Sequence, residues 1–192
     1  MLRHWKQTEL LLESDVGHLK HIFPNLRVLY ISIGKVLPNH LLALLSKLDF
    51  LSLQFDRGCR GAFREEPMLP SSRIVLPIKT LHLLISDAAN IHPLEHWDMP
   101  LLAHLECRES ALDMPSIPNI VWSIGRNLIS LRLWFEHDYV DLPDDMWRHL
   151  LALQYLGVTT FRLPLSSLIG HPLHTAVILG DGGHTSRARR QA

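Results

Sequence analysis

Apolar residues recur along the chain in the short pattern LxxLxL, separated by intervals of 20 to 30 residues. The copies begin at Leu26, Leu48, Ile78, Leu102, Leu128, Leu153 and Leu173, which gives spacings of 22, 30, 24, 26, 25 and 20 (26→48→78→102→128→153→173). Successive side chains of a β-strand point to opposite faces, so the second and third apolar positions of each copy share a face. The pattern predicts one strand per copy, with an apolar inner face and an outward polar face.

The intervals between these strands contain segments with helical spacing of apolar residues. Parallel strands need a crossover connection, commonly a helix, and the intervals are long enough for one. We predict helices starting near Pro38, Ser116 and Asp141, where a proline or a capping residue precedes the apolar run, and a fourth over residues 14–22.

A period near 25 residues that carries LxxLxL is typical of a leucine-rich-repeat solenoid. The predicted fold is therefore α/β: an arc of about seven irregular repeats, with a parallel sheet on the concave face and helices and loops outside. We expect one repeat domain over residues 1–180. Residues 56–77 mix Gly, Pro, Ser and charge and predict a loop insertion, either a binding loop or a mobile surface loop. Residues 181–192 lack apolar anchors and predict a disordered tail.

Two segments suggest a more specific relationship. The phrase Phe23-Pro24-Asn25-Leu26-Arg27-Val28-Leu29, with a variant at Met99-Pro100-Leu101-Leu102-Ala103-His104-Leu105, resembles the strand entry of fungal F-box/leucine-rich-repeat proteins. The resemblance covers about residues 15–180. It implies an arc-shaped module that recognises the substrate of a ubiquitin ligase. The segment before Phe23 is too short for an F-box, so a ligase adaptor is an expected partner only if an F-box lies outside this chain.

Composition and charge narrow the function classes. The 192 residues are 47% hydrophobic and 20% charged, which suits one globular domain. A formal net charge of zero argues against a nucleic-acid or anionic-membrane partner. No uncharged apolar run reaches the ~18 residues of a membrane span, and no signal peptide is evident. We expect a cytoplasmic or nuclear protein. Of its two cysteines, Cys107 occupies an apolar slot and is predicted to be a small buried hydrophobe.

Candidate chemistry is sparse. There is no GxSxG, GxxxxGK[ST] or GxGxxG motif, so we expect neither an enzyme nor a cofactor. Among the 13 histidines, His92 and His96 have a spacing that suits a shared metal ion, although Pro93 lies between them and no third ligand is marked. The alternative is that these are ordinary neutral, hydrogen-bonded histidines. Residues 181–186 contain Asp181, His184 and Ser186, the residue types of a hydrolase triad. A flexible tail cannot hold the geometry that a nucleophile and its base require.

The outward strand positions carry the functional prediction. If the strands stack in register, the fifth and seventh positions of the copies form two rows of side chains. Trp, Tyr and Arg are enriched at interaction hot spots, and Trp134 is the most suggestive exposed residue. The alternative is that Trp134 packs on Arg132, Glu136 or a loop. The predicted partner-binding residues are Tyr30, Gln54, His82, Glu106, Arg108, Arg132, Trp134 and Glu136.

The sequence thus predicts a protein–protein interaction module. Two alternatives are a truncated repeat fragment without independent function and a His-rich metal-binding protein.

Overall fold

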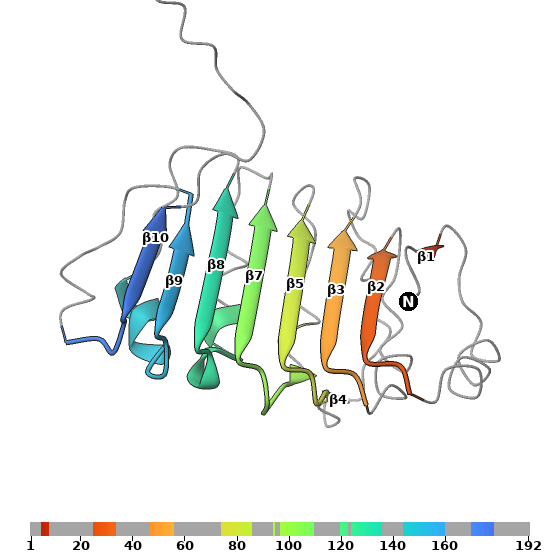
Figure 1. Ribbon diagram of the computed structural model, residues 1–192, viewed down its shortest axis with the longest axis horizontal. Helices are drawn as coiled ribbons and strands as arrows, with labels where there is room; N and C mark the ends of the chain where they lie inside the picture. Colours follow the sequence, from red (N-terminus) through yellow and green to blue (C-terminus); the bar gives the residue numbers. More distant parts are fainter. Residues whose placement is uncertain are drawn as a thin grey trace, which may run out of the picture.

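In a computed structural model the protein is built on one parallel sheet of eight strands (Figure 1). The structure describes residues 5–7, 25–33, 47–55, 74–85, 94, 97–109, 120–122, 124–135, 144–159 and 170–178. The strands follow one another in the sheet in chain order. They are β1 (Trp5–Gln7), β2 (Val28–Ile33), β3 (Phe50–Phe55), β5 (Thr80–Ile85), β7 (His104–Glu109), β8 (Ser130–Phe135), β9 (Tyr155–Val158) and β10 (Thr175–Ile178).

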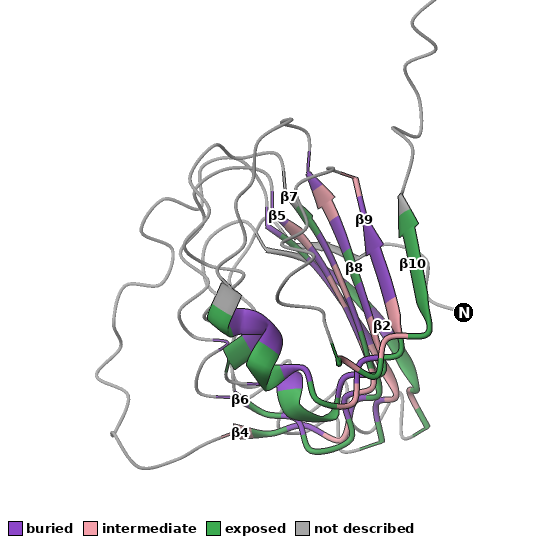
Figure 2. Ribbon diagram, turned by 90° about the vertical axis from the view of Figure 1, so that its left-hand side faces the viewer, coloured by how far each residue is buried: buried purple, intermediate pink, exposed green. Residues whose placement is uncertain are grey.

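The remaining described elements are short. Strands β4 (Ile74–Val75) and β6 (Trp97–Asp98) pair with each other in a second, two-stranded parallel sheet. Helical turns cover residues 120–122 and 124, η2 (Gly125–Asn127) and η3 (Asp144–His149). All of these lie on one side of the main sheet (Figure 2). The opposite side, which we call the open face, is covered by none of the described elements.

The core lies between the main sheet and these turns. The second apolar residues of five copies, Leu51, Leu81, Leu105, Leu131 and Leu156, pair in one straight register across neighbouring strands and are at most 1% exposed. The third apolar residues of these copies are also buried, and one of them is Cys107, a free cysteine. The strands and the burial of Cys107 are therefore confirmed, and the inward face is confirmed from β2 to β9. In the seventh copy the predicted inward residue Ala176 on β10 is instead exposed, because β10 is the last strand of the stack. At the two ends of the stack, Leu26 and Leu173 are only partly buried.

A repeated backbone motif fixes the start of each strand. The carbonyl oxygen of the residue just before one strand accepts hydrogen bonds from two successive backbone N–H groups at the start of the next. Arg27 thus accepts from Asp49 and Phe50, at 2.9 and 3.0 Å. The same arrangement recurs at Asp49, Lys79, Ala103, Ile129 and Gln154, with distances of 2.8 to 3.1 Å. Each bond satisfies a backbone donor that would otherwise remain unpaired on burial, so the motif holds the strands from β2 to β10 in one register.

Two of the predicted helical segments are described in part. The segment after Asp141 forms the 3-10 helix η3, which buries Met146 and Trp147. The segment after Ser116 gives helical residues 120–122 and 124 followed by η2. Packing here is close: a Cβ on Gly125 would lie 3.0 Å from Leu150 Cδ2. Tight packing between successive connections favours short turns. The helices predicted near Pro38 and over 14–22 lie outside the described residues.

The last four residues of the predicted loop insertion at 56–77 are described, and two of them form a short strand. Ile74 and Val75 form β4, and the Leu76 N–H donates to the carbonyl oxygen of Asp98 at 2.8 Å. Leu76 is buried at 1% exposure, so its burial and the pairing with β6 order this stretch. The rest of the insertion and the tail at 181–192 lie outside the described residues. In the part of the chain that is described, no helix has the length and apolar character to cross a membrane.

Candidate interaction surface

The outward side chains form the predicted rows across the open face. The fifth positions pair strand by strand from Tyr30 through Ser52, His82, Glu106 and Arg132 to Gly157. The seventh positions pair from Gln54 through Leu84 and Arg108 to Trp134. The stacking therefore brings seven of the eight predicted partner-binding residues onto one surface. Glu136 lies outside the described residues.

Charged groups meet at the centre of this surface. The Glu106 carboxylate lies 3.9 Å from Nε2 of His82 on one side and 3.7 Å from Nη1 of Arg132 on the other. The guanidinium carbon of Arg132 also sits 5.3 Å from the centre of the Tyr155 ring, a cation–π distance. Arg132 is thus oriented by two neighbours while 48% of its side chain stays exposed. A cation held in place but accessible loses little conformational freedom when a partner binds.

Aromatic rings extend this arrangement toward the N-terminal strands. The rings of Tyr30 and Phe50 are 5.3 Å apart, and Phe50 meets the His82 ring edge-on at 4.7 Å. Six side chains therefore form an unbroken line of contacts from β2 to β9, which we call the contact row: Tyr30, Phe50, His82, Glu106, Arg132 and Tyr155. Sequence reasoning missed Phe50 and Tyr155. They occupy the third position of their copies, which points outward by the same alternation, so extending the count two residues back would have found them.

Trp134 is less exposed than predicted. The guanidinium carbon of Arg108 lies 5.1 Å from the ring centre, so the ring packs on Arg108. Glu136, one of the alternatives, lies outside the described residues. The indole nitrogen is buried and has no hydrogen-bond partner. A buried unpaired N–H is costly, so the accessible part of Trp134 is its ring face and not its hydrogen-bond donor.

One rim of the surface carries a second charge cluster. The Asp49 carboxylate lies 3.2 Å from Lys79 Nζ and 2.8 Å from Arg27 Nη1. Hydrogen bonds from Lys79 and then Arg27 hold the pKa of Asp49 below its ordinary value. These side chains are well exposed, so the cluster orients charge at the rim more than it stabilises the fold.

Partial burial changes the pKa of His82 in the contact row. Desolvation lowers its pKa below the ordinary value of about 6.5, and the opposing attraction of Glu106 only partly offsets this. The unfolded chain therefore takes up a proton at His82 before the folded chain does. The contribution of His82 to stability is fully present above about pH 6.5 and is lost as the pH falls below that value.

We accordingly expect the stability of the wild-type protein to fall more steeply on acidification than that of His82→Gln. Urea unfolding at about pH 7.5 and about pH 5.5 measures both slopes, on either side of the ordinary histidine pKa. Because the chain has 13 histidines, the difference between the two proteins is the relevant quantity. An equal or steeper slope in His82→Gln would contradict the direction of the pKa shift.

Metal ligands do not gather in the described residues. No group of three or more His, Cys, Asp or Glu side chains in this part of the chain has the geometry to hold a metal ion. His92 and His96, the pair considered for a metal site, lie outside the described residues.

Comparisons with protein-family models, curated proteins and solved structures found no match for the chain.

Proposed function

We propose that the chain is a leucine-rich-repeat solenoid whose open face binds another protein. Three features support the repeat assignment: parallel strands in chain order, a single in-register line of buried leucines, and the carbonyl motif that recurs before the six strands from β2 to β9. Each is what equivalent coils stacked one on another require.

The contact row is the observation that carries the binding proposal. Neighbouring strands are about 4.8 Å apart, so six side chains on six strands extend over roughly 24 Å. This matches the width of a standard interface, which buries roughly 800 Å² on each partner. Its residue types, Tyr, Phe, His and Arg with a central carboxylate, suit recognition of a protein surface. The open face also carries Gln54, Arg108 and Trp134 beside the row.

The resemblance to F-box-associated repeat proteins suggests what the bound protein is. In this proposal the open face recognises the substrate of a ubiquitin ligase. A ligase adaptor is a partner only if an F-box lies outside this chain.

Arg132→Glu is expected to abolish partner binding while leaving the fold intact. The new carboxylate would stand beside Glu106 and replace a half-exposed cation, so a partner matched to positive charge would be repelled. We expect Trp134→Ala to weaken binding as well, through loss of ring contact. For each variant the loss should be at least about thirtyfold, the size of a hot-spot effect of about 2 kcal/mol.

Affinity purification with quantitative mass spectrometry, followed by titration of the purified partner, measures this loss. Val75→Lys is the matched control, because Val75 is 58% exposed on β4, on the side away from the open face. The thermal melt followed by circular dichroism should be similar for all proteins. Retained binding in Arg132→Glu, or loss in Val75→Lys, would exclude the open face as the binding surface.

A further inference from the structure

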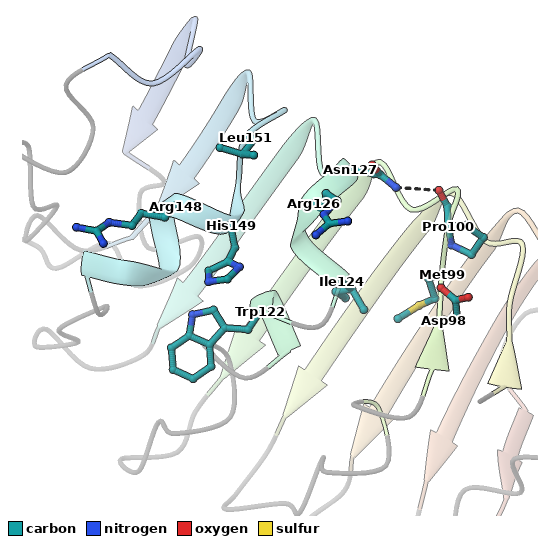
Figure 3. A pocket seen from close by; sticks show the side chains of 10 residues that line it. All are labelled: Asp98, Met99, Pro100, Trp122, Ile124, Arg126, Asn127, Arg148, His149 and Leu151. Carbon is teal, nitrogen blue, oxygen red and sulfur yellow. Dashed lines mark hydrogen bonds between the residues drawn. The ribbon is translucent and has the colours of Figure 1, made fainter. Parts of the chain in front are cut away.

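A pocket of about 470 Å³ lies at the strand-start edge of the molecule, away from the open face. Side chains from three stretches line it: residues 98–100 ahead of β7, residues 122, 124, 126 and 127 ahead of β8, and residues 148, 149 and 151 ahead of β9 (Figure 3). Equivalent parts of three consecutive repeats thus form its walls. No function assigned so far uses this pocket.

The framework of the pocket is held by hydrogen bonds. The side-chain amide of Asn127 donates to the carbonyl oxygen of Pro100 at 3.1 Å and ties two of the walls together. Turn hydrogen bonds from Leu128 to Gly125 and from Leu153 to Leu150, both 3.0 Å, fix the other segments. A pocket built on such turns is largely formed before a ligand enters, which lowers the entropic cost of binding.

The lining has apolar surface on which a ligand could pack. Met99 and Ile124 are buried at 4% and 7% exposure and contribute apolar surface at the base. Trp122 and Leu151 line the same pocket but remain 40% and 67% exposed. An exposed tryptophan beside a concave surface is a common feature of ligand sites.

Charge in the pocket is uneven. Arg126 and Arg148 contribute two guanidinium groups and Asp98 one carboxylate. Within the described part of the chain, none of the three has an ion-pair partner. In Figure 3 the Arg126 side chain lies between the His149 ring and the Asn127–Pro100 bond. Arg148 extends toward the rim, and Asp98 lies beside Met99 at the other end. The guanidinium of Arg126 therefore lies in the middle of the pocket, between the end that holds Trp122 and the end that holds Asp98.

We propose that this pocket binds an apolar organic anion. The apolar body packs on Trp122 and Leu151, and its carboxylate or phosphate pairs with Arg126. A guanidinium presents planar, paired donors that fit either anionic group. The pocket volume admits a ligand about the size of one aromatic ring with a short charged arm. This proposal does not depend on the open face being a binding surface.

Four ring compounds test the proposal: phenylacetate, phenyl phosphate, neutral benzyl alcohol and cationic phenethylamine. The affinity of each is measured from shifts of the Trp122 indole N–H signal in NMR titrations. We expect at least one anion to bind more tightly than benzyl alcohol, and phenethylamine to bind most weakly. Comparing phenylacetate with phenyl phosphate shows which anionic group the pocket prefers.

Two variants then assign the contacts. Arg126→Gln should weaken the preferred anion by about three- to tenfold, the range for an exposed to partly buried charged hydrogen bond. Binding of benzyl alcohol should hardly change. Trp122→Ala should weaken the binding of all four compounds. Because this variant lacks the indole signal, its affinities are measured by competition or from the signals of neighbouring residues. Arg132→Gln, on the open face, is the control and should leave every affinity unchanged.

The proposal is overturned if anions and benzyl alcohol bind the wild-type protein equally, or if none of the compounds binds. An unchanged anion affinity in Arg126→Gln would overturn it too. Both substituted side chains are exposed. If Trp122→Ala nevertheless loses its thermal transition, the Arg126→Gln comparison still decides the outcome.

Discussion

Leu131→Asp is expected to unfold the protein at room temperature. Leu131 is completely buried at the centre of β8, where it pairs with Leu105 on one side and Leu156 on the other. The substitution removes a well-packed leucine and buries a carboxylate that has no cation among the described inward-facing residues of the sheet. Together these effects cost about 5 kcal/mol or more, which is comparable to the whole stability of a typical domain.

The matched control is Leu84→Asp on the open face. Leu84 is partly exposed and stands next to Arg108 in the adjoining strand, so a carboxylate there stays hydrated and gains a nearby cation. We expect a change of no more than about 1 kcal/mol. Circular dichroism and urea unfolding of both variants give the comparison. Equal damage from the two substitutions would mean that the inward and open faces have been assigned wrongly.

Trp147→Ala is expected to cost about 3–5 kcal/mol of unfolding free energy, the range for deleting a large buried side chain. Trp147 is 1% exposed and anchors η3 in the apolar layer behind the sheet. Its loss would leave a cavity that short turns, held by local hydrogen bonds, cannot easily close. Urea unfolding at neutral pH measures the effect.

Trp147→Phe separates packing from polarity at the same site. The indole nitrogen of Trp147 is buried without a hydrogen-bond partner, so phenylalanine removes an unsatisfied donor while keeping most of the apolar volume. We expect this variant to lose clearly less stability than Trp147→Ala. If the two variants are equally destabilised, the packing role assigned to the ring is incorrect.

The sheet could be predicted because a short apolar pattern defines each strand and recurs along the sequence. The leucine pattern sets which side of each strand is apolar, and equal strand lengths leave one register that aligns Leu81, Leu105 and Leu131. The same alternation continues to Phe55, Ile85 and Phe135, which are buried at 0%, 2% and 6% exposure. Sequence reasoning ended each motif two residues early and so missed this part of the core.

Other features depend on contacts between distant residues. Strands of two residues are too short to show an alternation, so the pairing of Ile74 with Trp97 has no sequence signal. The partial burial of Trp134 depends on which neighbour covers the ring, and the register makes that neighbour Arg108. The pocket is assembled from three turns that each look unremarkable in isolation. Its arginines become a site only when the repeats are stacked.

The repeat fold and its open face both require parallel, in-register stacking of the strands in chain order. Interstrand nuclear Overhauser effects in the isotope-labelled protein test this most directly. We expect backbone contacts that place Leu105 opposite Leu131 and Leu131 opposite Leu156, with both strand pairs parallel. Antiparallel contacts, a shifted register, or contacts of helical spacing within the leucine motifs would contradict it.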